Sequence, residues 1–242
     1  MNDEVFRHCQ VLESCRQRSG RMLSVVDLVE RGTLSLKAAA VCLEVISNGG
    51  SFLVGARPGG SGKTTVMVAL LNFIPSGLDI VATDSPRKLR PDFYTRPACV
   101  LCPEIGSGPY YGYLWGREKL TAFFSLKRHG HLLASNLHAD TLEEAREQIC
   151  VQNGVWPSLF EAIELHLFLQ VEKTGKRILR SGWWLSGSGR YQEIIKDGLL
   201  TSSLPFEPKR LARPVSFLET LLNNGVKTLP EVRAGVLSYL KG

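Results

Sequence analysis

The glycine-rich segment at residues 58–65, PGGSGKTT, constrains the fold of this chain more than any other feature. It follows a short apolar run at residues 51–55 and precedes a helical pattern at residues 64–73 that ends before Pro75. Glycines give the backbone the freedom that a tight strand-to-helix connection requires. This order of strand, loop and helix is typical of α/β proteins, in which helices cover a mostly parallel sheet.

The loop has the residues of a phosphate-binding site. Backbone N–H groups around Gly59, Gly60 and Gly62 can converge on a phosphate, and the start of the following helix adds its positive dipole end. We expect Lys63 to reach the β- and γ-phosphates of ATP and Thr64 to bind Mg²⁺ through its hydroxyl. The other residues predicted to bind the nucleotide are Pro58, Ser61 and Thr65. The cofactors predicted from the loop are therefore ATP and Mg²⁺.

Arg57 departs from the strict pattern G-x-x-x-x-G-K-T, whose first glycine would fall at this position. An arginine costs conformational freedom here if the site needs a positive φ, although its charge could also lie beside the nucleotide. We therefore expect reduced nucleotide affinity. A glycine-rich structural turn with a solvated lysine stays open as the alternative interpretation.

The rest of the chain alternates strand and helix patterns up to about residue 150. Apolar runs typical of buried parallel strands occur at residues 79–83, 98–102 and 131–136. Helical patterns are expected at residues 1–22, 33–47 and 116–129, and again after a cap at Asp140 or Thr141. This alternation predicts further β-α units on the same sheet.

The pattern changes from Ile163 onward. Strict alternation there predicts an antiparallel meander of three strands, in which the lone His166 is a structural side chain. Two helices are expected at residues 215–224 and 228–240, and Thr228 with Glu231 fits a capping box for the second. The C-terminal part is therefore predicted to be helical.

Composition excludes several classes of protein. A chain of 242 residues with 44% hydrophobic residues can bury a core without disulfides or metals. No apolar run approaches the roughly 20 residues of a membrane span, and acids stand near the N-terminus where a signal peptide carries cations, so we expect a cytoplasmic protein. The six cysteines are expected to be free, with Cys99 and Cys102 in the core. The net charge of +6, from 29 basic and 23 acidic residues, favours anionic partners in general.

Three further segments resemble the motifs of a known family. Residues 80–86, IVATDSP, are similar to an Asp-box strand, and residues 96–105, RPACVLCPEI, are similar to a Walker B segment. Residues 131–140, HLLASNLHAD, look like a His box. Together with the helix, strand and loop at residues 36–75, they resemble the motor ATPases of type II and type IV secretion and of type IV pili.

The resemblance implies a fold and a set of catalytic residues. The implied fold is an α/β RecA-like P-loop NTPase core with a mostly parallel sheet, an antiparallel meander and a C-terminal helical segment. It divides the chain into a helical extension at residues 1–33, the ATPase core at 34–200 and the helical segment at 201–242. Glu104 or Asp84 would orient or deprotonate the attacking water, and His138 would sense the γ-phosphate. Glu104 would also share Mg²⁺ with Thr64.

The resemblance also implies partners. Family members work as homo-oligomers, usually hexamers, on a membrane-embedded secretion or pilus platform, so the motor is expected in the cytoplasm or peripherally at the inner membrane face. Two features depart from the family pattern: Gly106 and Ser107 replace the usual arginine and acid after Glu104, and only about 33 residues precede the core. Two alternatives therefore stay open. One is a nucleic-acid translocase on the same core, which we do not favour, and the other is a nucleotide-binding scaffold with weak or no turnover.

Overall fold

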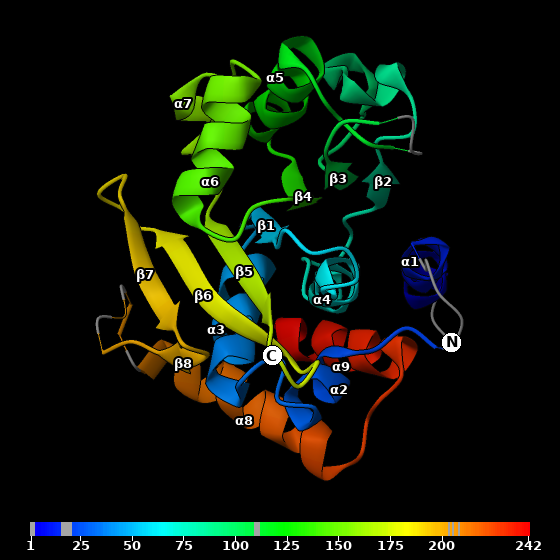
Figure 1. The fold of residues 1–242 in the computed structure, drawn as a ribbon. Coiled ribbons are helices and arrows are strands. Elements are labelled where there is room, and N and C mark those ends of the chain that lie inside the picture. The colour runs from blue at the N-terminus through cyan, green and yellow to red at the C-terminus, as the bar shows by residue number, and fades with distance from the viewer. Residues whose placement is uncertain (1–2, 16–20, 109–111, 203, 205, 208) are drawn as a thin grey trace.

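The computed structural model describes residues 3–15, 21–108, 112–202, 204, 206–207 and 209–242. Its strands form one sheet in the order β2-β3-β4-β1-β5-β6-β7-β8 (Figure 1). The strands are β1 (Phe52–Gly55), β2 (Ile80–Ala82), β3 (Cys99–Ile105), β4 (Leu132–Leu137), β5 (Leu165–Val171), β6 (Arg177–Leu185), β7 (Tyr191–Lys196) and β8 (Leu199–Leu200). The chain therefore crosses over repeatedly in its first half and meanders in its second.

The sheet is parallel where the sequence alternates strands with helices. Strands β2, β3, β4, β1 and β5 pair in parallel, whereas β5 to β8 pair antiparallel. Parallel neighbours need a long crossover connection, and the helices between these strands supply it. The predicted fold class, an α/β fold with a mostly parallel sheet, an antiparallel meander and C-terminal helices, is confirmed.

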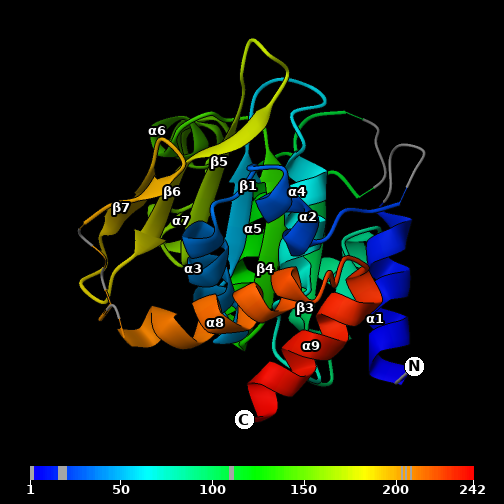
Figure 2. The same cartoon turned by 90° about the horizontal axis from the view of Figure 1, so that it is seen from below.

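Helices cover both faces of the sheet. They are α1 (Asp3–Ser14), α2 (Val25–Glu30), α3 (Leu36–Ser47), α4 (Lys63–Leu71), α5 (Arg117–Ser125), α6 (Leu142–Arg146), α7 (Pro157–Phe160), α8 (Lys209–Asn223) and α9 (Leu229–Lys241). Helices α5, α6 and α7 lie on one face, and α2, α3, α4, α8 and α9 lie on the other (Figures 1 and 2). None of the described helices combines the length and apolar character that crossing a membrane requires.

Two hydrophobic clusters separate the layers. In β1, Phe52 and Val54 belong to the larger cluster with α3 and α4, while Leu53 belongs to the smaller one with α5 and α7. This alternation follows from the two-residue period of a strand. The larger cluster takes residues from each of the three predicted parts of the chain, and their division into separate domains stays a prediction.

Short helical turns and one π-helix complete the structure. They are the 3₁₀ turns Pro86–Leu89, Pro91–Phe93 and Leu126–His129, and the π-helix Glu147–Gln152, which continues from α6. Thr141 caps α6 by accepting a hydrogen bond from the Glu144 N–H. The predicted capping box of α9 is confirmed, because the Thr228 hydroxyl and the Glu231 carboxylate exchange hydrogen bonds with each other's backbone N–H.

Some predicted boundaries are wrong. Helix α8 begins at Lys209 rather than at residue 215 and passes through Pro214, a residue that usually marks a helix boundary. The short helix α2 was not predicted, although Ser24 and Asp27 form a capping box for it. The N-terminal helix ends at Ser14, and residues 16–20 of the longer helix expected there lie outside the described residues.

Two expectations about core residues are confirmed. His166 is fully buried, and its Nε2 lies 3.0 Å from the Tyr191 hydroxyl, so it is a structural side chain of the meander. Burial lowers its pKa to about 3, which keeps the ring neutral. All six cysteines are free, and both Cys99 and Cys102 are fully buried in β3.

Arg233 of α9 joins three helices at the C-terminal end of α4. Its guanidinium is fully buried, and its Nη1 donates to the carbonyls of Asn72 and Ile74 at 2.9 and 2.6 Å. Its Nη2 donates to Glu4 of α1 at 3.1 Å and to the Pro75 carbonyl at 3.3 Å. A cation is favourable at this position because the last carbonyls of a helix carry partial negative charge. Helices α1, α4 and α9 are therefore held together by one buried charge.

Candidate functional site

The glycine-rich loop connects β1 to α4 as predicted. Gly60 and Gly62 have φ angles of 75° and 94°, the left-handed region that favours glycine. Val66 donates the first hydrogen bond of α4, to the Gly62 carbonyl at 2.9 Å. The N–H groups that precede Val66 at this helix end therefore have no acceptor within the helix, which leaves them available to an anion.

Arg57 does not take up the strained backbone that its position suggested. It is not among the described residues with positive φ, so the condition for a conformational cost at this position is not met. Its N–H donates to Asp140 Oδ1 at 2.8 Å, and its guanidinium makes two hydrogen bonds to the Glu144 carboxylate at 2.6 and 3.0 Å. Arg57 thus ties the entry of the loop to α6, and reduced nucleotide affinity stays a prediction.

Lys63 and Glu104 form the buried centre of the site. Their residues are only 6% and 5% exposed, and Lys63 Nζ lies 3.8 Å from Glu104 Oε1. Lys63 Nζ donates instead to the Ala56 carbonyl at 3.0 Å. Glu104 Oε1 has no hydrogen-bond partner among the described residues. The two charges therefore face each other across a gap that is longer than a hydrogen bond.

Burial dominates the protonation of both groups. Desolvation raises the pKa of Glu104 to about 7, and the attraction of Lys63 only partly opposes this shift. Desolvation also lowers the pKa of Lys63, against the opposing effects of Glu104 and Asp140. A carboxyl group with this pKa gains or loses its proton near neutral pH. A further positive charge beside Glu104 would lower its pKa and stabilise the carboxylate form.

His138 and Asn136 extend from the end of β4 toward this centre. His138 Nε2 lies 3.6 Å from Glu104 Oε1, and its Nδ1 lies 3.2 Å from the Arg57 carbonyl. Asn136 Nδ2 donates to the Pro103 carbonyl at 2.9 Å and to Thr64 Oγ1 at 3.4 Å, while its buried Oδ1 has no partner in the described structure. Strand β4 lies between β1 and β3, so it brings these side chains between the loop and Glu104.

Asp84 and Pro58 do not line the pocket described below with the other predicted site residues. Asp84 follows β2, and its carboxylate pairs with Lys88 at 2.7 Å. The structure thus brings together the loop from Gly59 to Thr65, Glu104 and His138.

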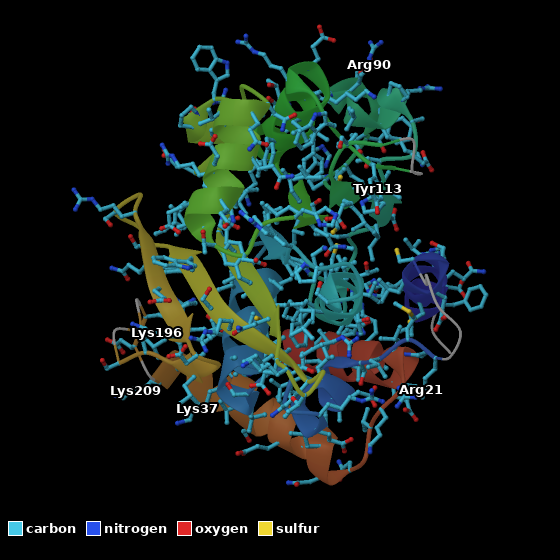
Figure 3. The ribbon with its side chains drawn as sticks, viewed as in Figure 1. Arg21, Lys37, Arg90, Tyr113, Lys196 and Lys209 are labelled. Atoms are coloured by element: carbon cyan, nitrogen blue, oxygen red, sulfur yellow. The ribbon has the colours of Figure 1, made fainter. Side chains whose placement is uncertain are left out.

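A pocket of about 600 Å³ lies over the loop. One wall consists of Gly59 to Val66, Glu104 and His138. The other wall comes from around α2 and from the β5–β6 turn, with Met22, Leu23, Leu28, Arg31, Thr33, Gly175, Lys176 and Arg177. Arg21, next to Met22, also lines it, and Tyr113 lines it from a further part of the chain; both are labelled in Figure 3. The pocket combines an anion-binding wall with a partly apolar one.

A larger hollow of about 830 Å³ lies between α1 and the segment that leads into β2. Its charged lining is mixed, with Arg7 and Arg96 beside Glu4 and Asp79, and Arg96 is already paired with Asp79. It has neither a glycine-rich backbone nor a buried lysine. The smaller pocket is therefore the better candidate for a functional site.

The residues of the smaller pocket fit Mg-ATP. Mg²⁺ prefers oxygen ligands and is usually held by one or two protein groups together with phosphates. The Thr64 hydroxyl and the Glu104 carboxylate supply such oxygens. No group of three His, Cys, Asp or Glu residues that could hold a metal by itself occurs in the described part of the chain. The unpartnered Glu104 Oε1 and Ser61 Oγ are polar atoms that a bound group would satisfy.

Sequence reasoning missed three residues of this site: Asn136, Arg31 and Arg177. Asn136 stands in the apolar strand of the predicted His box, two residues before His138, and a polar amide in such a strand was the signal that could have identified it. Arg31 and Arg177 are 146 positions apart (177 − 31) and meet only through the fold. No local pattern in the sequence points to them.

Comparisons with known proteins give structural matches only. No family model and no curated protein matches the chain. The VirB11 ATPase of the Brucella suis type IV secretion system, solved with sulphate, is similar over 70% of this chain and 67% of its own, with 16% identity and a TM-score of 0.45. The ATPase DotB of Legionella pneumophila is similar over 79% and 58%, with 14% identity and a TM-score of 0.46. DotB of Yersinia pseudotuberculosis is similar over 88% and 62%, with 12% identity and a TM-score of 0.48. The chain thus spans about two thirds or less of the length of these proteins.

Proposed function

We propose that this chain binds Mg-ATP in the pocket over the glycine-rich loop and hydrolyses it to ADP and phosphate. The observation that carries the proposal is the buried pair of Lys63 and Glu104 below that loop. Their charged atoms lie 3.8 Å apart, and Glu104 Oε1 has no hydrogen bond in the described structure. A buried carboxylate oxygen that accepts no hydrogen bond is costly, so it marks a place where a further group is expected.

Each part of the loop has a role in this proposal. The N–H groups at the start of α4 and the Lys63 ammonium bind the phosphates. The Thr64 hydroxyl and the Glu104 carboxylate hold the metal, and Asn136 keeps the Thr64 hydroxyl in place. Magnesium, when bound, neutralises charge that develops on the phosphate oxygens. Pro58 and Gly59 belong to the exposed tip of the loop.

Glu104 is the preferred residue to orient or deprotonate the attacking water. A base is most effective when its pKa lies near the working pH, and burial raises the pKa of Glu104 to about 7. His138, 3.6 Å from Glu104 Oε1, would sense the γ-phosphate. Asp84 is the weaker candidate for the base because it pairs with Lys88 and does not line the pocket.

The cellular role follows from the sequence motifs that resemble secretion and pilus motors. In this role the chain forms a homo-oligomer, a hexamer in that family, and acts on a membrane-embedded platform from the cytoplasmic side. Residues 34–200 would be the motor core, between the helical segments 1–33 and 201–242. A nucleic-acid translocase is not favoured.

Phosphate release from Mg-ATP tests the proposal. We expect turnover by the wild type and a loss of about a hundredfold or more in Lys63→Ala, because the substitution removes the phosphate-binding charge. Lys196→Ala, at an exposed position of β7, is the matched control and should keep wild-type activity. Glu104→Gln should bind Mg-ATP but release little phosphate.

Three outcomes would contradict the proposal in different ways. Binding of Mg-ATP without turnover by the wild type would favour the scaffold alternative. Turnover that depends on added DNA or RNA would favour the translocase. Phosphate release that survives Lys63→Ala would mean that the pocket is not where ATP is hydrolysed.

A further inference from the structure

Arg177 lies on the wall of the pocket that faces the glycine-rich loop. It is the first residue of β6, directly after the β5–β6 turn. Its Nε donates to the Gly60 carbonyl at 3.1 Å, and its Nη1 donates to the Gly175 carbonyl at 3.4 Å. Its Cδ lies 3.1 Å from the position that a Cβ on Gly62 would occupy. The guanidinium therefore touches the loop on both sides of Ser61.

Arg177 has no acidic partner in the part of the chain that the structure describes. Three other exposed arginines are each paired with an acidic residue: Arg57 with Glu144, Arg96 with Asp79 and Arg180 with Asp197. No ion pair is found among the described residues for Arg31 or Lys176 either, and both line the same wall of the pocket. A guanidinium held beside a phosphate-binding loop without a carboxylate keeps its charge available to an anionic ligand.

The turn that carries Arg177 is itself ordered by hydrogen bonds. The Glu172 N–H donates to the Lys176 carbonyl at 2.8 Å, and the Gly175 N–H donates to the Glu172 carbonyl at 2.8 Å. The Leu179 N–H donates to the Thr33 carbonyl at 2.8 Å, which attaches β6 to the segment after α2. Because the turn is fixed at both places, Arg177 reaches the loop with little freedom to lose on binding.

We propose that Arg177 is a phosphate-binding residue of this pocket and contacts the polyphosphate chain of the nucleotide from the side of the β5–β6 turn. The inference rests on the proposed function, since it assigns a second cation to the same ligand. The planar guanidinium can donate two parallel hydrogen bonds to phosphate oxygens, a fixed fork geometry that the ammonium group of a lysine lacks. The antiparallel meander thereby contributes directly to a site that the parallel strands otherwise build.

Calorimetric titrations with Mg-ADP and with inorganic tripolyphosphate test this assignment. We expect Arg177→Gln to weaken the binding of both ligands about tenfold, as for the loss of one charge-assisted hydrogen bond. Arg177→Lys should retain part of the affinity, because it keeps the positive charge but loses the planar arrangement of N–H donors. Arg180→Gln, on the same strand but paired with Asp197, is the matched control and should bind like the wild type.

The salt dependence separates a ligand contact from a structural role. Affinity of the wild type for tripolyphosphate should fall more steeply with added salt than that of Arg177→Gln, because the variant neutralises one charge fewer. Equal affinities and equal salt slopes would overturn the role of Arg177 and leave the pocket assignment intact. Weaker Mg-ADP binding with unchanged tripolyphosphate binding would also overturn it. If the wild type binds neither ligand, the proposed function itself fails.

Discussion

The two ends of helix α4 are both surrounded by buried charge, but the protein treats them differently. At the C-terminal end, Arg233 donates to the carbonyls of Asn72, Ile74 and Pro75 over distances of 2.6 to 3.3 Å. At the N-terminal end, Lys63 Nζ donates to the Ala56 carbonyl at 3.0 Å, and the described structure places no acidic oxygen within hydrogen-bond distance of it, since Glu104 Oε1 is 3.8 Å away. One end of the helix is closed by a cation from α9, while the other end is open to a pocket.

This difference separates a structural cluster from a binding site. At each end of α4, at least one buried atom makes no hydrogen bond to the described residues, for example Arg233 Nε at the C-terminal end and Glu104 Oε1 at the N-terminal end. A missing hydrogen bond alone therefore does not distinguish the two ends. What distinguishes them is that Arg233 donates to an acidic partner, Glu4, within hydrogen-bond distance, whereas Lys63 and Glu104 lie 3.8 Å apart and Glu104 Oε1 accepts no hydrogen bond from the described residues. A buried ion pair without a hydrogen bond next to an open pocket is the property that indicates a ligand.

Replacing Arg233 tests the closed end and should have the largest effect on stability. Arg233→Met removes the hydrogen bonds that join α1, α4 and α9, and we expect the free energy of unfolding to fall by about 3 kcal/mol. Urea denaturation monitored by circular dichroism measures it. Glu4→Gln, at the partly exposed rim of the cluster, should cost about 1 kcal/mol or less. A loss below about 1 kcal/mol for Arg233→Met would mean that the closed end is not stabilised by this charge.

Replacing Glu104 tests the open end and should have an effect that depends on pH. Burial raises the pKa of Glu104 from 4.5 to about 7, so the folded protein favours the protonated form. Its contribution to stability is therefore fully present below pH 4.5 and is lost as the pH rises through 7. We expect Glu104→Gln, which cannot ionise, to be about 2 kcal/mol more stable than the wild type at pH 8 and nearly equal to it at pH 4.5.

Denaturant titrations of both proteins at the two pH values give this comparison. His138→Gln, which changes the neighbour of Glu104 but leaves the carboxyl group in place, is the control and should keep the pH dependence of the wild type. A Glu104→Gln protein that is less stable than the wild type at pH 8 would show that the carboxylate is already satisfied without a ligand. The distinction between the two ends of α4 would then be lost.

Replacing Arg57 should have the smallest effect on stability. It tests whether the loop at the N-terminal end of α4 depends on its contact with α6. The side chain of Arg57 is 62% exposed and pairs with a Glu144 that is 34% exposed, so the pair is largely screened by water. We expect Arg57→Ala to change the free energy of unfolding by about 0.5 kcal/mol or less. Thermal unfolding at low and high salt measures it. A larger loss would show that the loop depends on α6 to keep its shape.

Local sequence patterns were sufficient for the loop, for most helices and for every strand of this fold except the short edge strand β8, which was not predicted. The parallel strands are short apolar runs, and the loop is fixed by glycines at positions such as Gly60 and Gly62, which adopt positive φ. Helix α8 began earlier than predicted because surrounding contacts tolerate Pro214 inside it. Propensity is a local property, and tertiary packing overrides it here.

The candidate site was predicted on one side only. Lys63, Thr64, Glu104 and His138 stand in motifs whose spacing could be recognised, and the fold brings them together. The opposite wall comes from a six-residue helix and a turn in the meander, neither of which carries a phosphate-binding pattern. Side chains such as Arg177 reach the loop only because β5 lies next to β1 in the sheet. That proximity depends on the topology and not on any local sequence signal.

The most direct test of the account is a calorimetric titration of the wild-type chain with ADP in the presence and absence of Mg²⁺. We predict saturable binding that is stronger with Mg²⁺ and is abolished by Lys63→Ala, while Lys196→Ala binds normally. Absence of binding by a folded wild-type protein, or binding that Lys63→Ala leaves unchanged, would contradict the claim that the N-terminal end of α4 is open because it holds a nucleotide.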